Sequence, residues 1–225
     1  IDEKAQAIIE TILADAFPTY DLLSEEDADA AAADPVAKGH RWIIDPLDGT
    51  TNFTFDSPPY AVSIALQHQR EIVVGVVYDV PADTLYTAIR DEGTYRNGAR
   101  VHVSAVDRVA HSLVATGFPF RTPDNIDAYM NVVGAFIHTA RGVRRQGAAA
   151  VDLSRLAAGE FTGFFETGLK PWDVAAGILL IEEAGGRVTD FHGRPDALFA
   201  GQMVASNGPI HDAMLEYVQP ICDMR

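Results

Sequence analysis

The segment of residues 42–53, WIIDPLDGTTNF, constrains the fold more than any other part of the chain. Residues 42–44 predict a short buried strand that runs directly into Asp45. Pro46 has no N–H to donate, so we expect the hydrogen-bonded ladder to end there. The Asp-Gly pair at residues 48–49 then predicts a turn. The chain must therefore fold so that a buried strand delivers acidic residues to one edge of a sheet.

The acidic residues of this segment have the spacing of a cation site. Asp45 and Asp48 stand three residues apart, with the carbonyl of Leu47 between them, and Mg²⁺ prefers oxygen ligands of this kind. Gly49 lets the backbone approach a ligand closely, so that its N–H and that of Thr50 can cradle phosphate oxygens. A solvated turn is the alternative, because Asp-Gly is a common turn pair. The whole string is much more specific than the pair.

Two further acidic positions are ambiguous when taken alone. Glu25 and Glu26 form a pair that is typical of a solvated surface. Asp173 follows Trp172 at the start of a predicted helix, where an aspartate is either a ligand or a helix cap. Trp172 itself is more typical of a packing anchor than of a substrate platform.

Charge and cysteine content exclude several classes of protein. The formal net charge is −15, which disfavours direct nucleic-acid binding, because such a surface repels phosphate. A phosphorylated substrate then needs local positive charge, for which bound metal cations are the natural source. No apolar stretch reaches the roughly 20 residues of a membrane span. Cys222 is the single cysteine, so no intrachain disulfide forms, as suits a cytoplasmic protein.

A small basic run has two interpretations. Arg141, Arg144 and Arg145 lie close together in the sequence. A solvated loop is the main interpretation. Local attraction of a substrate phosphate, or a contact within a dimer, is the other.

The order of expected elements indicates an α+β fold with α/β character. We expect a single domain over residues 1–225, with halves at 1–110 (a helix, then an antiparallel sheet) and 111–225 (alternating helix and strand). The expected helices are residues 3–16, 124–137, 148–158, 172–184 and 209–219. The expected strands are residues 42–44, 60–66, 72–78, 84–89, 93–96, 112–116, 161–166 and 203–205.

WIIDPLDGTTNF and KPWDVAAGILLIEEAGG resemble, in this order, the two signature motifs of the inositol monophosphatase family. The resemblance includes the SEE, GVVYD and YRNG stretches and covers nearly the whole chain. It implies a layered α/β/α/β/α sandwich of the inositol monophosphatase / sugar phosphatase type, two or three Mg²⁺ ions per site, sensitivity to lithium and a homodimer.

The resemblance also implies roles for individual residues. Glu25 and Thr50 match the pair that orients the attacking water, and Asp48 lies on the leaving-group side. The metal ligands implied are Glu25, Asp45, Leu47 (through its carbonyl), Asp48, Asp173 and, for a weaker third ion, Asp2. The substrate contacts implied are Asp48, Gly49, Thr50, Ala149, Glu166 and Asp173.

Some positions depart from the family pattern. Ser24 replaces the glycine that usually precedes the paired glutamates, which we expect to be tolerated. Residues 147–150 (GAAA) lack the hydroxyl that the family often has there. Lys170 stands where some relatives have histidine. The family's N-terminal helix would precede Asp2.

The expected function is Mg²⁺-dependent hydrolysis of a small phosphorylated polyol or sugar, with myo-inositol monophosphate as the leading substrate. The alternatives within the superfamily are fructose 1,6-bisphosphate, 3′-phosphoadenosine 5′-phosphate and histidinol phosphate. An alternative of another class is a protein-binding regulator linked to the transcription machinery.

Overall fold

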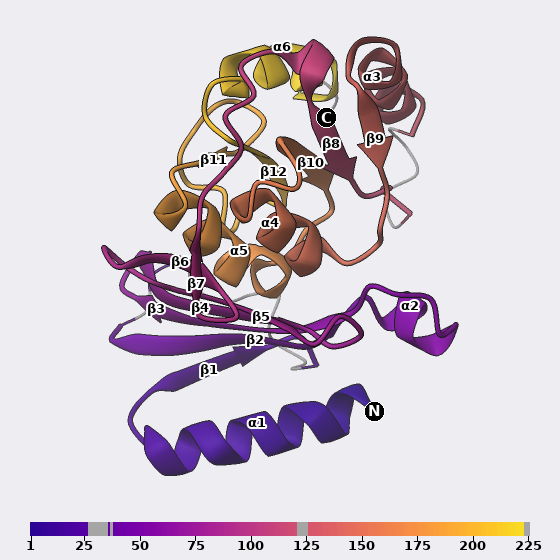
Figure 1. Ribbon diagram of the computed structural model, residues 1–225. Helices are drawn as coiled ribbons and strands as arrows, with labels where there is room; N and C mark the ends of the chain where they lie inside the picture. The colour runs from indigo at the N-terminus through magenta and orange to yellow at the C-terminus, as the bar shows by residue number, and fades with distance from the viewer. Residues whose placement is uncertain (27–35, 37, 121–125, 223–225) are drawn as a thin grey trace.

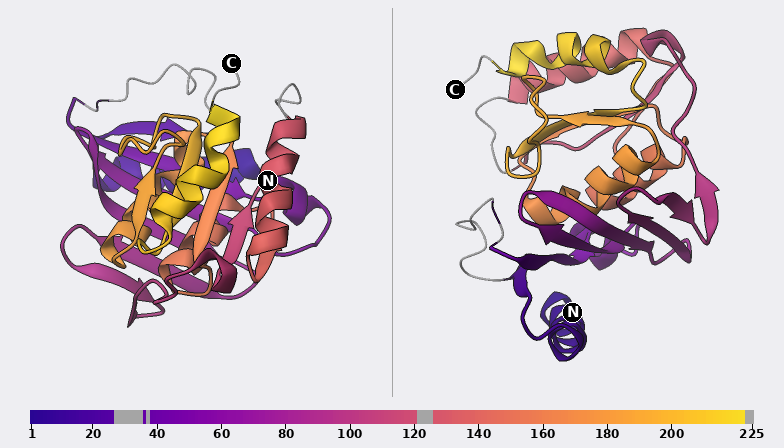
Figure 2. Two further views of the ribbon diagram at one scale, coloured as in Figure 1. Left: turned by 90° about the horizontal axis from the view of Figure 1, so that it is seen from above. Right: turned by 90° about the vertical axis from the view of Figure 1, so that its left-hand side faces the viewer.

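The computed structural model describes residues 1–26, 36, 38–120 and 126–222. Helices and sheets alternate as stacked layers (Figure 1; Figure 2, right). From one side to the other these are α1, a seven-stranded sheet, the pair α4 and α5, a five-stranded sheet, and the pair α3 and α6. The bounds are α1 (Asp2–Ala16), α3 (Ile126–Thr139), α4 (Ala149–Ala157), α5 (Pro171–Glu183) and α6 (His211–Cys222). The expected layered α+β fold is confirmed.

The seven-stranded sheet follows the order of the sequence, from β1 to β7. β1 pairs with β2 in parallel, and every later pair is antiparallel. This parallel pair matters for the site, because it brings the C-terminal ends of two strands to one edge. The bounds are β1 (Asp21–Ser24), β2 (His40–Asp48), β3 (Ala61–His68), β4 (Glu71–Asp79), β5 (Thr84–Ile89), β6 (Gly93–Arg96) and β7 (Ala99–Val101).

The expectation that Pro46 ends the ladder of β2 is wrong. The pairing with β3 shifts register between Asp45 and Asp48, and Asp48 then pairs with Ala61. Pro46 has no N–H to give, so it sits inside a bulge that the ladder passes over. The bulge places both carboxylates at the same end of the strand.

The five-stranded sheet has the order β11-β12-β10-β8-β9. β10 and β9 pair with β8 in parallel, whereas β12 pairs with β10 and β11 antiparallel. The bounds are β8 (Leu113–Thr116), β9 (Gly142–Arg144), β10 (Gly163–Thr167), β11 (Arg187–Thr189) and β12 (Gln202–Ser206). Two short helices, α2 (Thr50–Thr54) and the 3-10 helix η2 (Val109–His111), complete the described elements.

The middle helix layer is buried between the two sheets. In α5 every residue from Val174 to Ile181 is buried, as expected for a helix that is covered on all sides. The first turns of α4 and α5 emerge at one edge of this layer, and β2 ends beside them. The sequence therefore builds a core that directs two helix N-termini and an acidic strand end to one place.

Several short elements were not expected from the sequence. These include β1, β7, β9 and β11, which have only three or four residues each. Residues 123 and 124, expected at the start of a helix, and most of the polar stretch 24–39 lie outside the described residues. Among the described residues, no helix is both long and apolar enough to pass through a membrane. The extent of the domain, residues 1–225, stays a prediction.

Candidate active site

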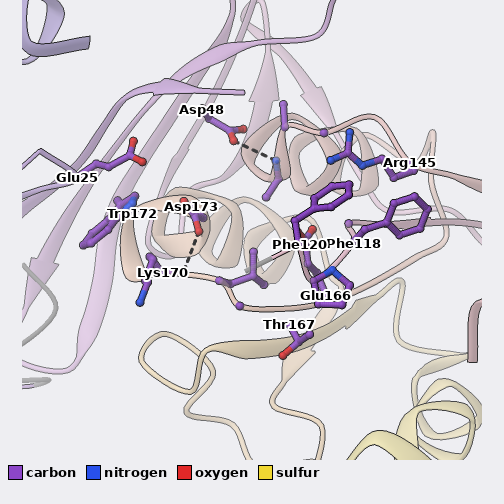
Figure 3. Close-up of a pocket in the computed structure, with 17 residues that line it drawn as sticks. Glu25, Asp48, Phe118, Phe120, Arg145, Glu166, Thr167, Lys170, Trp172 and Asp173 are labelled. Atoms are coloured by element: carbon purple, nitrogen blue, oxygen red, sulfur yellow. Dashed lines mark hydrogen bonds between the residues drawn. The ribbon is translucent and has the colours of Figure 1, made fainter. Parts of the chain in front are cut away.

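A polar cavity of about 220 Å³ opens where the acidic end of β2 meets the first turns of α4 and α5 (Figure 3). Three acidic side chains, Glu25, Asp48 and Asp173, line it. Figure 3 shows Arg145, Phe118 and Phe120 on one side of the cavity and Glu25, Trp172 and Lys170 on the other. The remaining lining residues are Gly117, Pro119, Gly147, Ala148, Ala149, Glu166, Thr167, Gly168 and Leu169.

Glu25 reaches the site through the parallel strands β1 and β2. Ser24 pairs with Ile44 in register, and the N–H of Glu25 donates to the carbonyl of Ile44 at 3.2 Å. Parallel strands in register bring equivalent ends to the same edge. Glu25 and Asp45 therefore lie next to each other, although 20 residues of sequence separate them. The sequence alone could not show this, because β1 is too short to be recognised.

Helix α1 fixes the turn that carries Glu25. The hydroxyl of Ser24 donates to Glu10 Oε1 at 2.8 Å, and the N–H of Glu26 donates to Gln6 Oε1 at 3.2 Å. Ser24 is fully buried, so the departure from the family's glycine is used to join α1 to β1.

Asp45 and Leu47 form a compact turn within the bulge. Asp45 is 2% exposed, and its Oδ1 accepts a hydrogen bond from the N–H of Leu47 at 3.0 Å. The carbonyl of Leu47 accepts from the hydroxyl of Thr50 at 3.2 Å. A carbonyl oxygen has two lone pairs, so that of Leu47 keeps one for a further partner. Because the hydroxyl proton of Thr50 is donated, its oxygen remains an acceptor.

Asp48 is seated on the first turn of α4. Its Oδ1 accepts from the N–H of Ala149 at 3.2 Å, and its Oδ2 accepts from the N–H of Ala150 at 2.8 Å. The first N–H groups of a helix have no partner within the helix and attract negative charge. Ala149 lies on the cavity wall, as expected of a substrate contact, but its N–H already serves Asp48.

Asp173 performs two roles that the sequence left as alternatives. Its Oδ2 accepts from the N–H of Lys170 at 2.7 Å, and its own N–H donates to the carbonyl of Lys170 at 3.1 Å. It therefore caps α5, which begins at Pro171. The same carboxylate lines the cavity. Trp172 is 7% exposed, which supports its role as a packing anchor.

The acidic groups raise one another's pKa. Burial is the main cause of the raised pKa of Asp45, and the charges of Asp48, Glu25 and Asp173 add to it. Burial and then the charge of Asp173 raise the pKa of Asp48 to about 7, against the lowering effect of its two backbone hydrogen bonds. Such a cluster is costly unless positive charge compensates it.

The donor set fits hard divalent cations. All its atoms are oxygens, from the carboxylates of Glu25, Asp45, Asp48 and Asp173 and the carbonyl of Leu47, and Mg²⁺ is typically held by one or two carboxylates together with water and phosphate. Among the described side chains, no group of three or more His, Cys, Asp or Glu residues stands ready to enclose an ion. The fit therefore rests on the chemistry of the oxygen donors and not on a closed cage of side chains.

Gly49 and Asn52 shape the loop after β2. Gly49 has φ +89°, and a Cβ there would lie 3.1 Å from the carbonyl oxygen of Pro59 and 3.2 Å from the Cβ of Ala148. Only glycine fits both restrictions. The amide of Asn52 donates to the carbonyls of Pro59 at 2.7 Å and Gln146 at 2.8 Å. The loop is thereby fastened to the segment that leads into α4.

Glu166, on β10, also lines the cavity. Its pKa is raised, first by burial and then by the charges of Asp152, Asp173 and Asp48, whereas Arg145 lowers it. The Arg145 side chain and the two phenylalanines beside it are cavity residues that the sequence did not identify as such. They come from loops without periodicity, and only the basic run at residues 141–145 gave a signal.

Not every expected site residue lines the cavity. Asp45, Leu47, Gly49 and Thr50 do not line it. Asp45 is coupled by charge to Glu25, Asp48 and Asp173, and Gly49 lies against Gly147 and Ala148 of the cavity wall. Asp2 opens α1 and lies 3.9 Å from the terminal amino group of Ile1; it does not line the cavity.

Comparisons with known proteins agree with one another. The profile of the "Inositol monophosphatase family" matches residues 1–222. The chain is 43% identical to an inositol-1-monophosphatase of Rhizobium meliloti, over 97% of this chain and 81% of that protein. It is 41% identical to the Nus factor SuhB of Escherichia coli K12, over 96% and 79%. The crystal structure of the extragenic suppressor protein suhB from Bartonella henselae superposes with a TM-score of 0.89 at 39% identity, over 97% and 83%.

Proposed function

The chain belongs to the inositol monophosphatase family, and from that premise we propose that it is a Mg²⁺-dependent phosphatase that hydrolyses myo-inositol monophosphate to inositol and phosphate. The observation that carries the proposal is the meeting of Glu25, Asp48 and Asp173 in one cavity, with Asp45 coupled to all three by charge. Asp48 and Asp173 also accept backbone hydrogen bonds from α4 and Lys170, but those bonds do not require the two carboxylates to share a cavity with Glu25. Bound cations would compensate the gathered negative charge.

Four carboxylates and one carbonyl would hold the ions. They are Glu25, Asp45, Asp48, Asp173 and the carbonyl of Leu47, and Asp2 remains a proposal for a weaker third ion. When bound, Mg²⁺ supplies an activated water and offsets the negative charge of the ester.

Thr50 and Glu25 would orient the attacking water. Thr50 donates its proton to the carbonyl of Leu47, so its oxygen can only accept from the water. Glu25 offers a second acceptor from β1. A water that donates both protons directs its lone pair away from these residues, toward the phosphorus. Holding the reactants in this way accounts for much of the rate that an enzyme of this kind needs.

Asp48 and Glu166 would serve the leaving group. Asp48 is rigidly held by the N–H groups of Ala149 and Ala150, so a water bound to it can protonate the departing alkoxide. Glu166 would accept a hydrogen bond from a polyol hydroxyl. The amides of Gly49 and Thr50 are proposed to contact the phosphate.

The size of the cavity favours a small ester. It measures about 220 Å³, below the roughly 300–1,000 Å³ of sites for drug-sized ligands. This supports inositol monophosphate over 3′-phosphoadenosine 5′-phosphate. Fructose 1,6-bisphosphate and histidinol phosphate remain in the test panel.

The test is phosphate release from these four esters, with Mg²⁺ and with a chelator. We expect chelator-sensitive turnover with inositol 1-phosphate well ahead of the others. Faster turnover of another ester would change the proposed substrate but leave the proposed mechanism in place. No turnover of any ester by folded protein would refute the proposal that the protein is an enzyme. The same assay with lithium, and sizing chromatography, test the proposed lithium sensitivity and homodimer. Fractionation of cells tests the proposed cytoplasmic location.

A second candidate is a protein-binding role in transcription. It is motivated by the 41% identity to a protein named Nus factor, and it is compatible with catalysis. A pull-down with RNA polymerase and its elongation factors tests it. Specific retention would support this role, and retention equal to that on blank resin would remove it.

A further inference from the structure

An aromatic turn and one arginine form the outer wall of the cavity. The N–H of Phe120 donates to the carbonyl of Phe118 at 2.8 Å, which closes a three-residue turn around Pro119. The two phenyl rings are 6.0 Å apart and meet edge to face at 80°. The guanidinium carbon of Arg145 lies 5.6 Å from the centroid of Phe118 and 5.2 Å from that of Phe120. We call these three residues the Arg145 wall.

The two rings hold the arginine by its charge. A guanidinium within about 6 Å of an aromatic face is attracted to the ring quadrupole, and here two rings act on one cation. Phe120 is 73% exposed, so contacts with Phe118 and Arg145, and not burial in the core, position its ring. At Gly147, a Cβ would lie 2.6 Å from Arg145 Nη1. The adjacent backbone therefore leaves space for this placement.

The hydrogen-bond donors of Arg145 are not used by the part of the protein that the structure describes. An arginine has five N–H donors. The other arginines near the middle layer use theirs: Arg155 donates to Gln146 and Asp79, and Arg90 donates to Glu182 and the carbonyl of Ile72. Arg145 makes no such bond to a described residue. Aromatic faces do not consume N–H donors in the guanidinium plane, so these remain available to a ligand.

Arg145 faces a carboxylate across the same cavity. Glu166 lines it from β10, and the two charges attract each other, yet no ion pair joins them among the described contacts. A space between an N–H fork and a carboxylate suits a group that accepts from one and donates to the other. A hydroxyl does both. A second phosphate accepts only, and it would be repelled by Glu166.

We propose that Arg145 and Glu166 together form a subsite for neighbouring hydroxyls of the leaving group, which makes Arg145 a specificity-determining residue for polyol esters. The inference rests on the proposed phosphatase function. It names the chemistry of the alcohol: vicinal hydroxyls, without a second anionic group. The Arg145 wall holds the donor in place before the substrate arrives, which reduces the entropy lost on binding.

The experiment compares Arg145→Gln with a matched control, Arg144→Gln. Arg144 does not line the cavity; it is exposed, and its Nη1 donates to the carbonyl of Val143. Both variants are assayed with inositol 1-phosphate, fructose 1,6-bisphosphate and propyl phosphate, which has no hydroxyl. We expect Arg145→Gln to raise KM for inositol 1-phosphate about tenfold or more, as for the loss of a hydrogen bond to a charged group. kcat should change less than about threefold, propyl phosphate should be unaffected, and the control should behave as wild type.

A binding measurement separates this subsite from the chemistry. Calorimetric titration of myo-inositol, with Mg²⁺ and inorganic phosphate present, should show affinity reduced in Arg145→Gln and retained in Arg144→Gln. Phe120→Leu removes one of the two rings and should give a smaller loss in the same direction.

Several outcomes would overturn the inference. A rise in KM confined to fructose 1,6-bisphosphate would make Arg145 an anion site, and an equal rise for all three esters would make it a general attractor of phosphate. A changed association state on sizing chromatography with unchanged KM would place it in an interface. Wild-type protein that hydrolyses none of the three esters would instead contradict the proposed function itself. If Arg145→Gln does not fold, Phe120→Leu decides, and unchanged inositol binding in it would refute the subsite.

Discussion

The carboxylate of Asp48 accepts a 2.8 Å hydrogen bond from the N–H of Ala150, a residue 102 positions later in the chain. With the parallel bond from Ala149, it docks the acidic end of β2 onto the first turn of α4. One side chain thus serves both the proposed chemistry and the joining of two layers.

Asp48→Asn should lower activity by orders of magnitude and should be less stable than Asp45→Asn by about 1 kcal/mol. Both substitutions remove a buried charge, but an asparagine at position 48 has one carbonyl oxygen, so its NH₂ group would face one of the two N–H donors of α4 and leave it unsatisfied. Urea unfolding in chelator measures the stability, and phosphate release measures the activity. Equal stability of the two variants would show that the two bonds do not contribute.

Asp45→Asn should be equally inactive but more stable than wild type without metal, by about 1 kcal/mol. The pKa of Asp45 is raised in the folded protein, so near neutral pH its carboxyl opposes folding, and this penalty decreases as the pH falls toward the pKa of the unfolded chain. The amide oxygen still accepts from Leu47. Urea unfolding in chelator tests this. A less stable variant would contradict it, and Asp48→Asn, which loses a backbone hydrogen bond as well as the charge, provides the internal control.

Magnesium should raise the melting temperature of the wild-type protein. Binding at about 100 times Kd stabilises by ~2.7 kcal/mol, which corresponds to roughly 5–10 °C for a chain of this size. A thermal scan with Mg²⁺ and with chelator measures the shift. Asp45→Asn should lose most of it, and a full shift in that variant would remove Asp45 from the ligand set.

Asn52→Ala should lower kcat about tenfold to a hundredfold, because it releases the carbonyls of Pro59 and Gln146 that fix the loop after β2. The free energy of unfolding should fall by about 1–2 kcal/mol. Thr54→Ala is a suitable control, since among the described residues that hydroxyl bonds to the carbonyl of Thr50, within the same short helix. Equal activity of the two variants would refute the role of Asn52 in fixing the loop after β2.

The contribution of His211 to the unfolding free energy should fall by roughly 2 kcal/mol between pH 7 and pH 5. Its side chain is fully buried, and burial, then the charge of Arg187, lowers its pKa from 6.5 to about 4. A lowered histidine pKa means that the unfolded chain binds the extra proton, so this stability is present above pH 6.5 and is lost as the pH falls toward 4.

The hydrogen bonds of His211 explain why it stays neutral. Thr189 already donates its hydroxyl proton to the carbonyl of Asp190, so it accepts from His211 Nε2 at 2.9 Å, and Nδ1 accepts from the hydroxyl of Ser206 at 2.9 Å. Urea unfolding across the pH range checks the slope. His211→Gln should remove this contribution, so that the variant loses roughly 2 kcal/mol less than wild type between pH 7 and pH 5, whereas His138→Gln, at the exposed end of α3, should follow wild type.

The sequence predicted the parts of the site that one continuous motif encodes. Asp45, Leu47 and Asp48 lie within a few residues of one another on one strand, and Asp173 marks the start of a helix whose pattern is unambiguous. Glu25 was found through the family resemblance alone, because its strand, β1, has only four residues. The prediction that the β2 ladder ends at Pro46 was wrong, because pairing with β3 resumes after a bulge, and the proline alone does not show whether the partner strand continues.

The Arg145 wall was beyond prediction for a different reason. Phe118 and Phe120 are 27 and 25 residues away from Arg145 in the sequence, in loops where no periodicity indicates which side chains meet. Their contact depends on how β8 and β9 pair, and β9 has only three residues. Local sequence cannot fix an arrangement that a short strand pairing determines.

The acidic cluster draws on β1, β2, α4 and α5, which span most of the chain. A ribosome must therefore release residues from 25 to beyond 173 before the cluster can exist, and no early fragment can trap the ions. Ion binding would then stabilise only the fully folded protein. Magnesium would therefore slow unfolding without accelerating folding. Dilution from urea should show a refolding rate that is nearly independent of magnesium and an unfolding rate that is not.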